Sequence, residues 1–186
     1  MRHQKKRWLA ALLTLCMLLS ILPSISLAFG ESEETWSGNR TNQTIDGGTH
    51  TITLSNLTID SPGLGKSAID ITGNADVTFI LEGNNTLSGR PNHPAIWVQS
   101  GSSVTFEGTG TLNTSAGGTT PGFGAAGIGG GYGASSNFGN ITINGGTIIA
   151  RGSGGGAGIG GGYEVGSGTV TGNVTINGGY VTAIGG

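Results

Sequence analysis

The sequence predicts an all-β fold, a right-handed parallel β-helix (β-solenoid) of about five coils, and three observations favour this fold. First, a seven-residue block, AGIGGGY, occurs at residues 126–132 and again at 157–163. Second, each copy is followed by a block of the form Asn-apolar-Thr-Ile-Asn-Gly-Gly, at residues 140–146 and 173–179. Third, the segments are short, rich in β-branched residues and broken by glycine, and none after residue 28 carries a long helical stripe.

Fainter copies of the same unit extend toward the N-terminus. An apolar-Thr-apolar triplet opens each unit, and a small residue followed by Ile comes further along in four of them. We expect equivalent residues to stack coil on coil about 4.8 Å apart, with the threonines outward and the isoleucines in the core. The predicted threonine column is Thr53, Thr78, Thr105, Thr142 and Thr175. The predicted isoleucine column is Ile69, Ile96, Ile128 and Ile159.

Asparagines and glycines fit the turns between these segments. Because Asn140 aligns with Asn173, and Asn144 with Asn177, we expect amide ladders at the corners of the coils. All 39 glycines follow residue 28. Such a composition is typical of disordered chains unless a repeat places the glycines at turns that need positive φ or close backbone approach.

The first 28 residues are expected to be a cleaved secretory signal peptide. Four of the first seven residues are basic, an apolar run follows from residue 8 to residue 22, and the small residues Ser26 and Ala28 suit a signal peptidase. The run is shorter than the roughly 20 residues of a bilayer span. The only cysteine, Cys16, lies inside it, so the mature chain has no thiol. We expect a secreted or cell-surface protein without membrane insertion of the mature chain.

The mature chain is predicted to divide into a cap and a repeat region. Residues 29–50, with Trp36, would form an N-terminal cap that covers the first coil, because the end coils of a solenoid expose unpaired strand edges. Residues 51–186 would be the β-helix repeats. The sequence ends where another AGIGGG block would be due, so we expect a truncated chain that lacks a C-terminal anchor or partner domain.

The charge of the mature chain disfavours nucleic acid as a partner. Four basic residues remain after the signal peptide, against ten acidic ones, which gives a net charge of −6. Nucleic-acid binding depends on clustered Lys and Arg that neutralise phosphates. We therefore expect no nucleic-acid partner.

The run from Ile52 through Thr111-Leu112 to AGIGGG and NITINGGT resembles the glycine-rich repeats of exported proteins from clostridia and related bacteria. The N-terminal half is similar to the clostridial carbohydrate-binding β-helix family, whose described member binds polygalacturonate and calcium. The resemblance implies a parallel β-helix, a surface location and polysaccharide binding. Calcium is a candidate cofactor, with Asp60, Asp70 and Asp76 as conceivable oxygen ligands and ordinary surface solvation as the simpler interpretation.

Residues for catalysis are not evident in the sequence. Hydrolysis of a glycosidic bond needs two facing carboxylates, and the acidic residues Asp60, Asp70, Asp76, Glu82 and Glu107 are scattered. Neither His50 nor His93 has the Gly-His-Gly setting of polygalacturonases. We expect no enzyme, and a polysaccharide lyase or hydrolase remains the alternative.

A candidate binding face follows from strand alternation. The residues after the column isoleucines, Asp70, Trp97, Gly129 and Gly160, should point outward. Aromatic rings stack on sugar rings, and cations attract acidic polysaccharides. The candidate ligand-binding residues are therefore Asp70, Trp97, Tyr132, Tyr163, Lys66, Arg90 and Arg151. In the alternative interpretation, Trp97 packs under a loop and the tyrosines stack on each other for stability.

Two classes of function stay open. One is a carbohydrate-binding module, for which acidic plant or cell-wall polysaccharide is a candidate ligand. The other is a passive structural stalk or adhesin repeat with no ligand of its own. A binding module predicts unusual outward residues gathered on one face, whereas a stalk predicts interchangeable surfaces in every coil.

Overall fold

The computed structural model describes residues 33–60, 63–118, 120–164 and 169–186. In this part of the chain the regular structure is fifteen β-strands and one short 3-10 helix, η1 (Gly133–Ser135). The described residues contain no helix long and apolar enough to cross a membrane. The expected signal peptide, residues 1–28, lies outside the described residues.

The strands fall into three sets, one for each face that the chain visits in every coil. The first face consists of β3 (Thr49–Ile59), β5 (Asp76–Glu82), β8 (Ser103–Gly108), β11 (Asn140–Ile143) and β14 (Asn173–Ile176). The second face consists of β6 (Asn84–Pro91), β9 (Thr111–Gly117), β12 (Thr147–Arg151) and β15 (Tyr180–Ile184). The third face consists of β2 (Gln43–Asp46), β4 (Ile69–Thr72), β7 (Ile96–Val98), β10 (Ile128–Gly129) and β13 (Ile159–Gly160).

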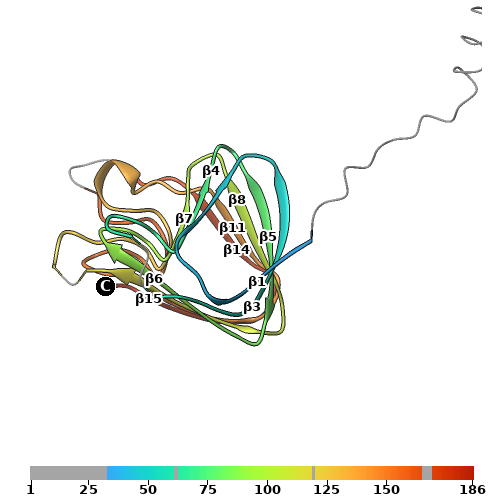
Figure 1. The fold of residues 1–186 in the computed structure, drawn as a ribbon. Coiled ribbons are helices and arrows are strands. Elements are labelled where there is room, and N and C mark those ends of the chain that lie inside the picture. The colour runs from blue at the N-terminus through green and yellow to red at the C-terminus, as the bar shows by residue number, and fades with distance from the viewer. Residues whose placement is uncertain (1–32, 61–62, 119, 165–168) are drawn as a thin grey trace, which may run out of the picture. The chain divides into compact units, whose positions relative to one another are not determined.

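Every strand pairs in parallel with the equivalent strand of the next coil. The long strand β3 pairs with β5 through its first half and with β6 through its last residues, so it joins the first two faces into one sheet. Figure 1 shows the strands curled round a common interior, with β5, β8, β11 and β14 on one side. The fold is therefore all-β with a curled, all-parallel sheet, and this arrangement is compatible with a β-solenoid.

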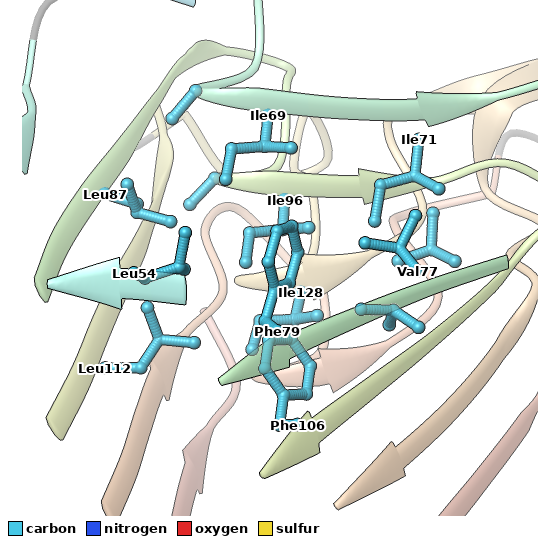
Figure 2. Close-up of a cluster of buried hydrophobic side chains, with 14 of the residues drawn as sticks. Leu54, Ile69, Ile71, Val77, Phe79, Leu87, Ile96, Phe106, Leu112 and Ile128 are labelled. Atoms are coloured by element: carbon cyan, nitrogen blue, oxygen red, sulfur yellow. The ribbon is translucent and has the colours of Figure 1, made fainter. Parts of the chain in front are cut away.

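The core consists of inward side chains stacked from coil to coil. Ile69 pairs with Ile96, Ile96 with Ile128, and Ile128 with Ile159, which confirms the predicted isoleucine column. The first three are fully buried, whereas Ile159 is only partly buried. Phe79 and Phe106 stack beside this column with ring centroids 5.9 Å apart (Figure 2). Burial of such side chains removes apolar surface from water and is the main stabilising contribution to the fold.

The predicted threonine column is correct except at its first member. Thr78, Thr105, Thr142 and Thr175 pair in register. In β3, however, Thr51 pairs with Thr78, and Thr53 pairs with Ile80, so the expected alignment was two residues too far along. Both registers place apolar side chains inward, because strand alternation repeats every two residues. The corner that follows decides between them, since Asn56, with a φ of 53°, then aligns with Gly83, with a φ of 58°.

The predicted amide ladders are present at the corners. The Asn173 side chain donates to Asn140 Oδ1 at 3.0 Å, and that of Asn177 donates to Asn144 Oδ1 at 2.9 Å. The second ladder reaches a third coil, because the Asn144 amide donates to Glu107 at 3.3 Å. These ladders lie in exposed positions.

Residues expected to cap the first coil contribute two strands of their own. Strand β1 (Glu34–Asn39) pairs with β3, and β2 pairs with β4, so both continue the parallel pattern. Trp36 is 4% exposed and its ring lies 6.3 Å from that of Phe79, while the Arg40 guanidinium lies 5.7 Å above the Trp36 ring. The indole thus covers the end of the core.

Candidate functional site

The strands of the third face bring the residues of the expected binding column together. Asp70 pairs with Trp97, Trp97 with Gly129, and Gly129 with Gly160. The column is not the open surface that strand alternation suggested. Asp70 is only 8% exposed, both glycines are buried, and Trp97 alone is partly exposed. Strands β7, β10 and β13 have only two or three residues each, and long connecting segments flank them.

A row of aromatic rings lies beside this column. Tyr132, which follows β10, stacks against Tyr163, which follows β13, with ring centroids 6.4 Å apart and an interplanar angle of 10°. Phe123 adds a third ring, 5.2 Å from Tyr132. Phe123 is 48% exposed and Tyr163 is 38% exposed. The two predicted tyrosines therefore contact each other, and the row keeps substantial apolar surface in water.

Between Trp97 and this row is a cavity of about 200 Å³, which we call the Trp97 pocket. Its walls come from the turn between β6 and β7, from Trp97 itself, and from the segment between β10 and β11 that contains η1. The lining residues are Asn92, His93, Pro94, Trp97, Gly131, Tyr132 and Ser135. The Tyr132 N–H donates to the Asn92 carbonyl at 3.2 Å, which ties the two walls together.

The backbone has special geometry at two positions next to Trp97, Asn92 and Gly129. Asn92 adopts a φ of 70°, a left-handed conformation that Asn tolerates better than other residues with a side chain, and the chain turns there. Gly129 is the neighbour of Trp97 in the next coil and carries no side chain. A Cβ at Gly129 would lie 1.9 Å from the Gly160 carbonyl oxygen, so a larger residue cannot stand there. Gly129 therefore has to be glycine, and it places no side chain beside Trp97.

Asp70 lies in an electrostatic cluster behind the pocket. Burial raises the pKa of the Asp70 carboxyl above its ordinary value, while the nearby Ser67 hydroxyl, Lys66 and His93 act in the opposite direction. The Ser67 Oγ is buried and makes no hydrogen bond of normal geometry. Burial lowers the pKa of His93, against the attraction of Asp70. His93, which the sequence analysis considered only for catalysis, thus connects this cluster to the pocket.

The three candidate cations do not form one cluster. The Arg90 N–H donates to the Lys66 carbonyl at 3.0 Å, so these two residues lie in neighbouring coils. Arg151 pairs with Ser115, which in turn pairs with Ser88, so one coil without a cation separates it from the coil of Arg90. Arg151 lines a second cavity of about 370 Å³, mostly among glycine and serine residues.

The aspartates considered as calcium ligands lie apart, each with its own partners. Asp60 accepts a hydrogen bond from Ser88 at 3.0 Å, and Asp76 accepts one from Ser103. Asp70 belongs to the cluster behind the pocket. Across residues 33–60, 63–118, 120–164 and 169–186, no three His, Cys, Asp or Glu side chains gather closely enough to hold a metal ion.

Comparison with known proteins does not assign a function to this chain. No protein-family model matches the chain, and no match was found among the curated proteins or the solved structures.

Three features of this site were not predicted from the sequence. Phe123 lies in a glycine-rich connection, outside the repeat columns, and its only sequence signal is an aromatic residue in a turn that begins with Pro121. The pocket residues His93 and Ser135 are ordinary loop residues in the sequence. What the site offers chemically is apolar ring surface beside a small number of neutral hydrogen-bonding groups.

Proposed function

We propose that the chain is a secreted or cell-surface protein that binds carbohydrate without catalysing a reaction. The observation that carries the proposal is the aromatic row of Phe123, Tyr132 and Tyr163 next to the Trp97 pocket. Sugar rings present apolar C–H faces that pack on aromatic rings, and their hydroxyl groups pair with neutral polar side chains. An exposed row of large aromatic residues is otherwise unfavourable on the surface of a monomeric protein.

The fold in this proposal is a right-handed parallel β-helix of about five coils. Successive coils begin at β3, β5, β8, β11 and β14. Parallel strands joined by crossover connections are right-handed in about 98% of cases, which supports the handedness. A solenoid of this kind exposes a long lateral surface, and such surfaces suit extended polymeric ligands.

Acidic polysaccharide is one candidate ligand within this proposal. Lys66, Arg90 and Arg151 would attract it, with Lys66 and Arg90 in neighbouring coils and Arg151 at the second cavity. Calcium would be the other means of holding an acidic chain against a protein with an excess of acidic residues.

A passive stalk is the second candidate function, and the stacking of Tyr132 on Tyr163 favours it. Stacked aromatic pairs stabilise a protein by about 0.5–1.5 kcal/mol beyond the area that they bury. In this interpretation the aromatic row strengthens the contact between coils, and the Trp97 pocket is a packing defect between loops.

A glycan array separates the two candidates. The purified protein is applied with calcium and with a chelator, and its folding is checked in both conditions by circular dichroism. A carbohydrate-binding protein should retain at least one class of polysaccharide above background, and loss of the signal in chelator would indicate a calcium-dependent ligand. Absence of binding to every glycan in both conditions, with the protein folded, would favour the stalk.

A further inference from the structure

We propose that the Trp97 pocket receives one uncharged pyranose ring, as a chain end or a side branch of the ligand. The inference rests on the proposed carbohydrate-binding function and deepens it, because it assigns a subsite and a class of sugar. It goes beyond the aromatic row, since it concerns a cavity formed by two different loops and a tryptophan of β7.

The walls of the pocket match the two surfaces of a sugar ring. Trp97, Tyr132 and Pro94 provide apolar surface for C–H groups. Asn92, His93 and Ser135 provide an amide, an imidazole and a hydroxyl group, each able to pair with a sugar hydroxyl. Small-molecule sites combine apolar walls with a few polar groups in this manner.

The size of the pocket limits the ligand to about one ring. Sites for drug-sized ligands have volumes of about 300–1,000 Å³, and this cavity has about 200 Å³. The two walls are held together by the hydrogen bond from Tyr132 to Asn92. A continuous chain of internal sugar residues would need a longer groove, whereas a single terminal or branching residue fits a cavity of this size.

The charge distribution favours an uncharged ring over a uronate. Among the residues that the structure describes, no Lys, Arg, Asp or Glu lines the pocket, and His93 is the one titratable lining residue besides Tyr132. Burial keeps the pKa of His93 below its ordinary value, so its imidazole is mostly neutral at pH 7. Lys66 and Asp70, which lie behind it, are of opposite sign and shift the pKa of His93 in opposite directions. A carboxylate on the sugar would therefore find no cation inside the pocket.

The pocket is also specific to one place in the repeat. In the column of Trp97 the neighbouring coils carry Asp70 on one side and Gly129 on the other. A tryptophan next to a glycine, beneath a loop with a left-handed Asn92, occurs once along this column. The stalk interpretation gives no reason for such a difference between coils.

The test is a ligand-observed NMR titration of the purified protein with single-ring probes. The uncharged probes are the methyl glycosides of glucose, galactose and mannose, and the charged probe is methyl galacturonide. We expect saturable binding of at least one uncharged glycoside and weaker binding of the uronide. Trp97→Ala should weaken the binding about tenfold or more, a loss that corresponds to about 1.4 kcal/mol.

Two further variants keep the test decisive if Trp97→Ala alters the fold. Ser135→Tyr narrows the pocket from the exposed η1 segment and should also abolish binding, with an unchanged melting temperature. Tyr180→Ala removes an aromatic side chain that is 70% exposed and lines none of the described pockets, and it should bind as the parent does.

Other outcomes would contradict either the pocket inference alone or the proposed function as well. Binding of the uronide alone, lost in Arg151→Ala but retained in Ser135→Tyr, would overturn the pocket inference and leave carbohydrate binding intact. Binding of uncharged glycosides that is unchanged in both pocket variants would do the same. Failure to bind any single-ring probe, together with a glycan array without signal, would overturn the proposed function as well.

Discussion

The side-chain oxygen of Asn85 accepts a hydrogen bond from the backbone N–H of Leu57, at 2.9 Å, in the interior of the protein. The same side chain donates to the carbonyl oxygens of Glu82, at 3.0 Å, and of Thr111, at 3.2 Å. Asn85 thus connects three successive coils. In its column the neighbouring coils carry the apolar residue Leu112 on one side and Leu57 itself on the other.

Replacement of Asn85 should destabilise the protein even when the new residue is leucine, which both neighbouring coils carry at this position. Asn85→Leu keeps a similar side-chain volume but leaves the buried Leu57 N–H without a partner, so we expect a loss of about 1–3 kcal/mol in the free energy of unfolding. Urea denaturation measures it. The control is Asn173→Ala at the exposed ladder, which should lose less than about 1 kcal/mol. Equal losses in the two variants would contradict the special role of Asn85.

The isoleucine column predicts that the effect of a substitution on stability depends strongly on whether the side chain points inward or outward. Ile128→Asp places an unpaired charge in the core, which costs several kcal/mol and is comparable with the whole stability of a domain. The matched control is Ile149→Asp, because Ile149 pairs with Asn113 and is partly exposed on the outer side of β12. We expect the first variant to be unfolded or to melt far below the parent, and the second to melt close to it. Similar melting of the two would show that the register is wrong.

The register of β3 can be tested by cross-linking, since the described residues contain no cysteine. Directly paired residues lie about 4.8 Å apart, within the range that a disulfide bridges, whereas an offset of two residues adds about 6.6 Å along the strand and exceeds that range. The pair Thr51→Cys with Thr78→Cys should therefore oxidise readily, and the pair Thr53→Cys with Thr78→Cys should not. Mass spectrometry of the oxidised proteins gives the answer, and the reverse preference would restore the alignment expected from the sequence.

The burial of Asp70 predicts the direction in which the stability of the protein changes with pH. Its pKa is raised in the folded state, so its stabilising contribution is complete below its unfolded pKa and is lost as the pH rises through the folded pKa. Asp70→Asn should remove this loss. We expect the melting temperature of the variant, relative to the parent, to rise between about pH 3 and about pH 7. A relative melting temperature that is constant or falls over this range would mean that burial is not the dominant influence on the pKa of Asp70.

Much of the fold is encoded in the sequence through local repetition. The alignment of Ile69, Ile96, Ile128 and Ile159 follows from counting residues in successive units, because stacked coils repeat the same inward positions. The position of Thr51 does not follow in this way. Strand β3 alternates from Thr51 to Ser55, so two registers bury equally apolar faces, and only the corner at Asn56 distinguishes them.

The site was less predictable because it depends on the loops. Alternation gives the direction of Asp70 and Trp97 from their strands, but it says nothing of the connecting segments that cover Asp70 and flank Trp97. Loops do not repeat from coil to coil, so a column argument misses Phe123 and His93. The contact between Tyr132 and Tyr163 is the exception, since each tyrosine follows the column isoleucine of its coil by the same number of residues.

The most direct test of the account is the retention of four proteins on immobilised polysaccharide. The parent, Trp97→Ala, Tyr132→Ala and Thr105→Ala are compared on polygalacturonate and on a neutral galactan, at low and high salt, with the melting temperature of each recorded. Thr105 is the control because it lies in the outward threonine column of the first face, on β8. Our account predicts that Trp97→Ala and Tyr132→Ala elute earlier than the parent on at least one column, while Thr105→Ala elutes with the parent. Equal retention of all four folded proteins on both columns would contradict it.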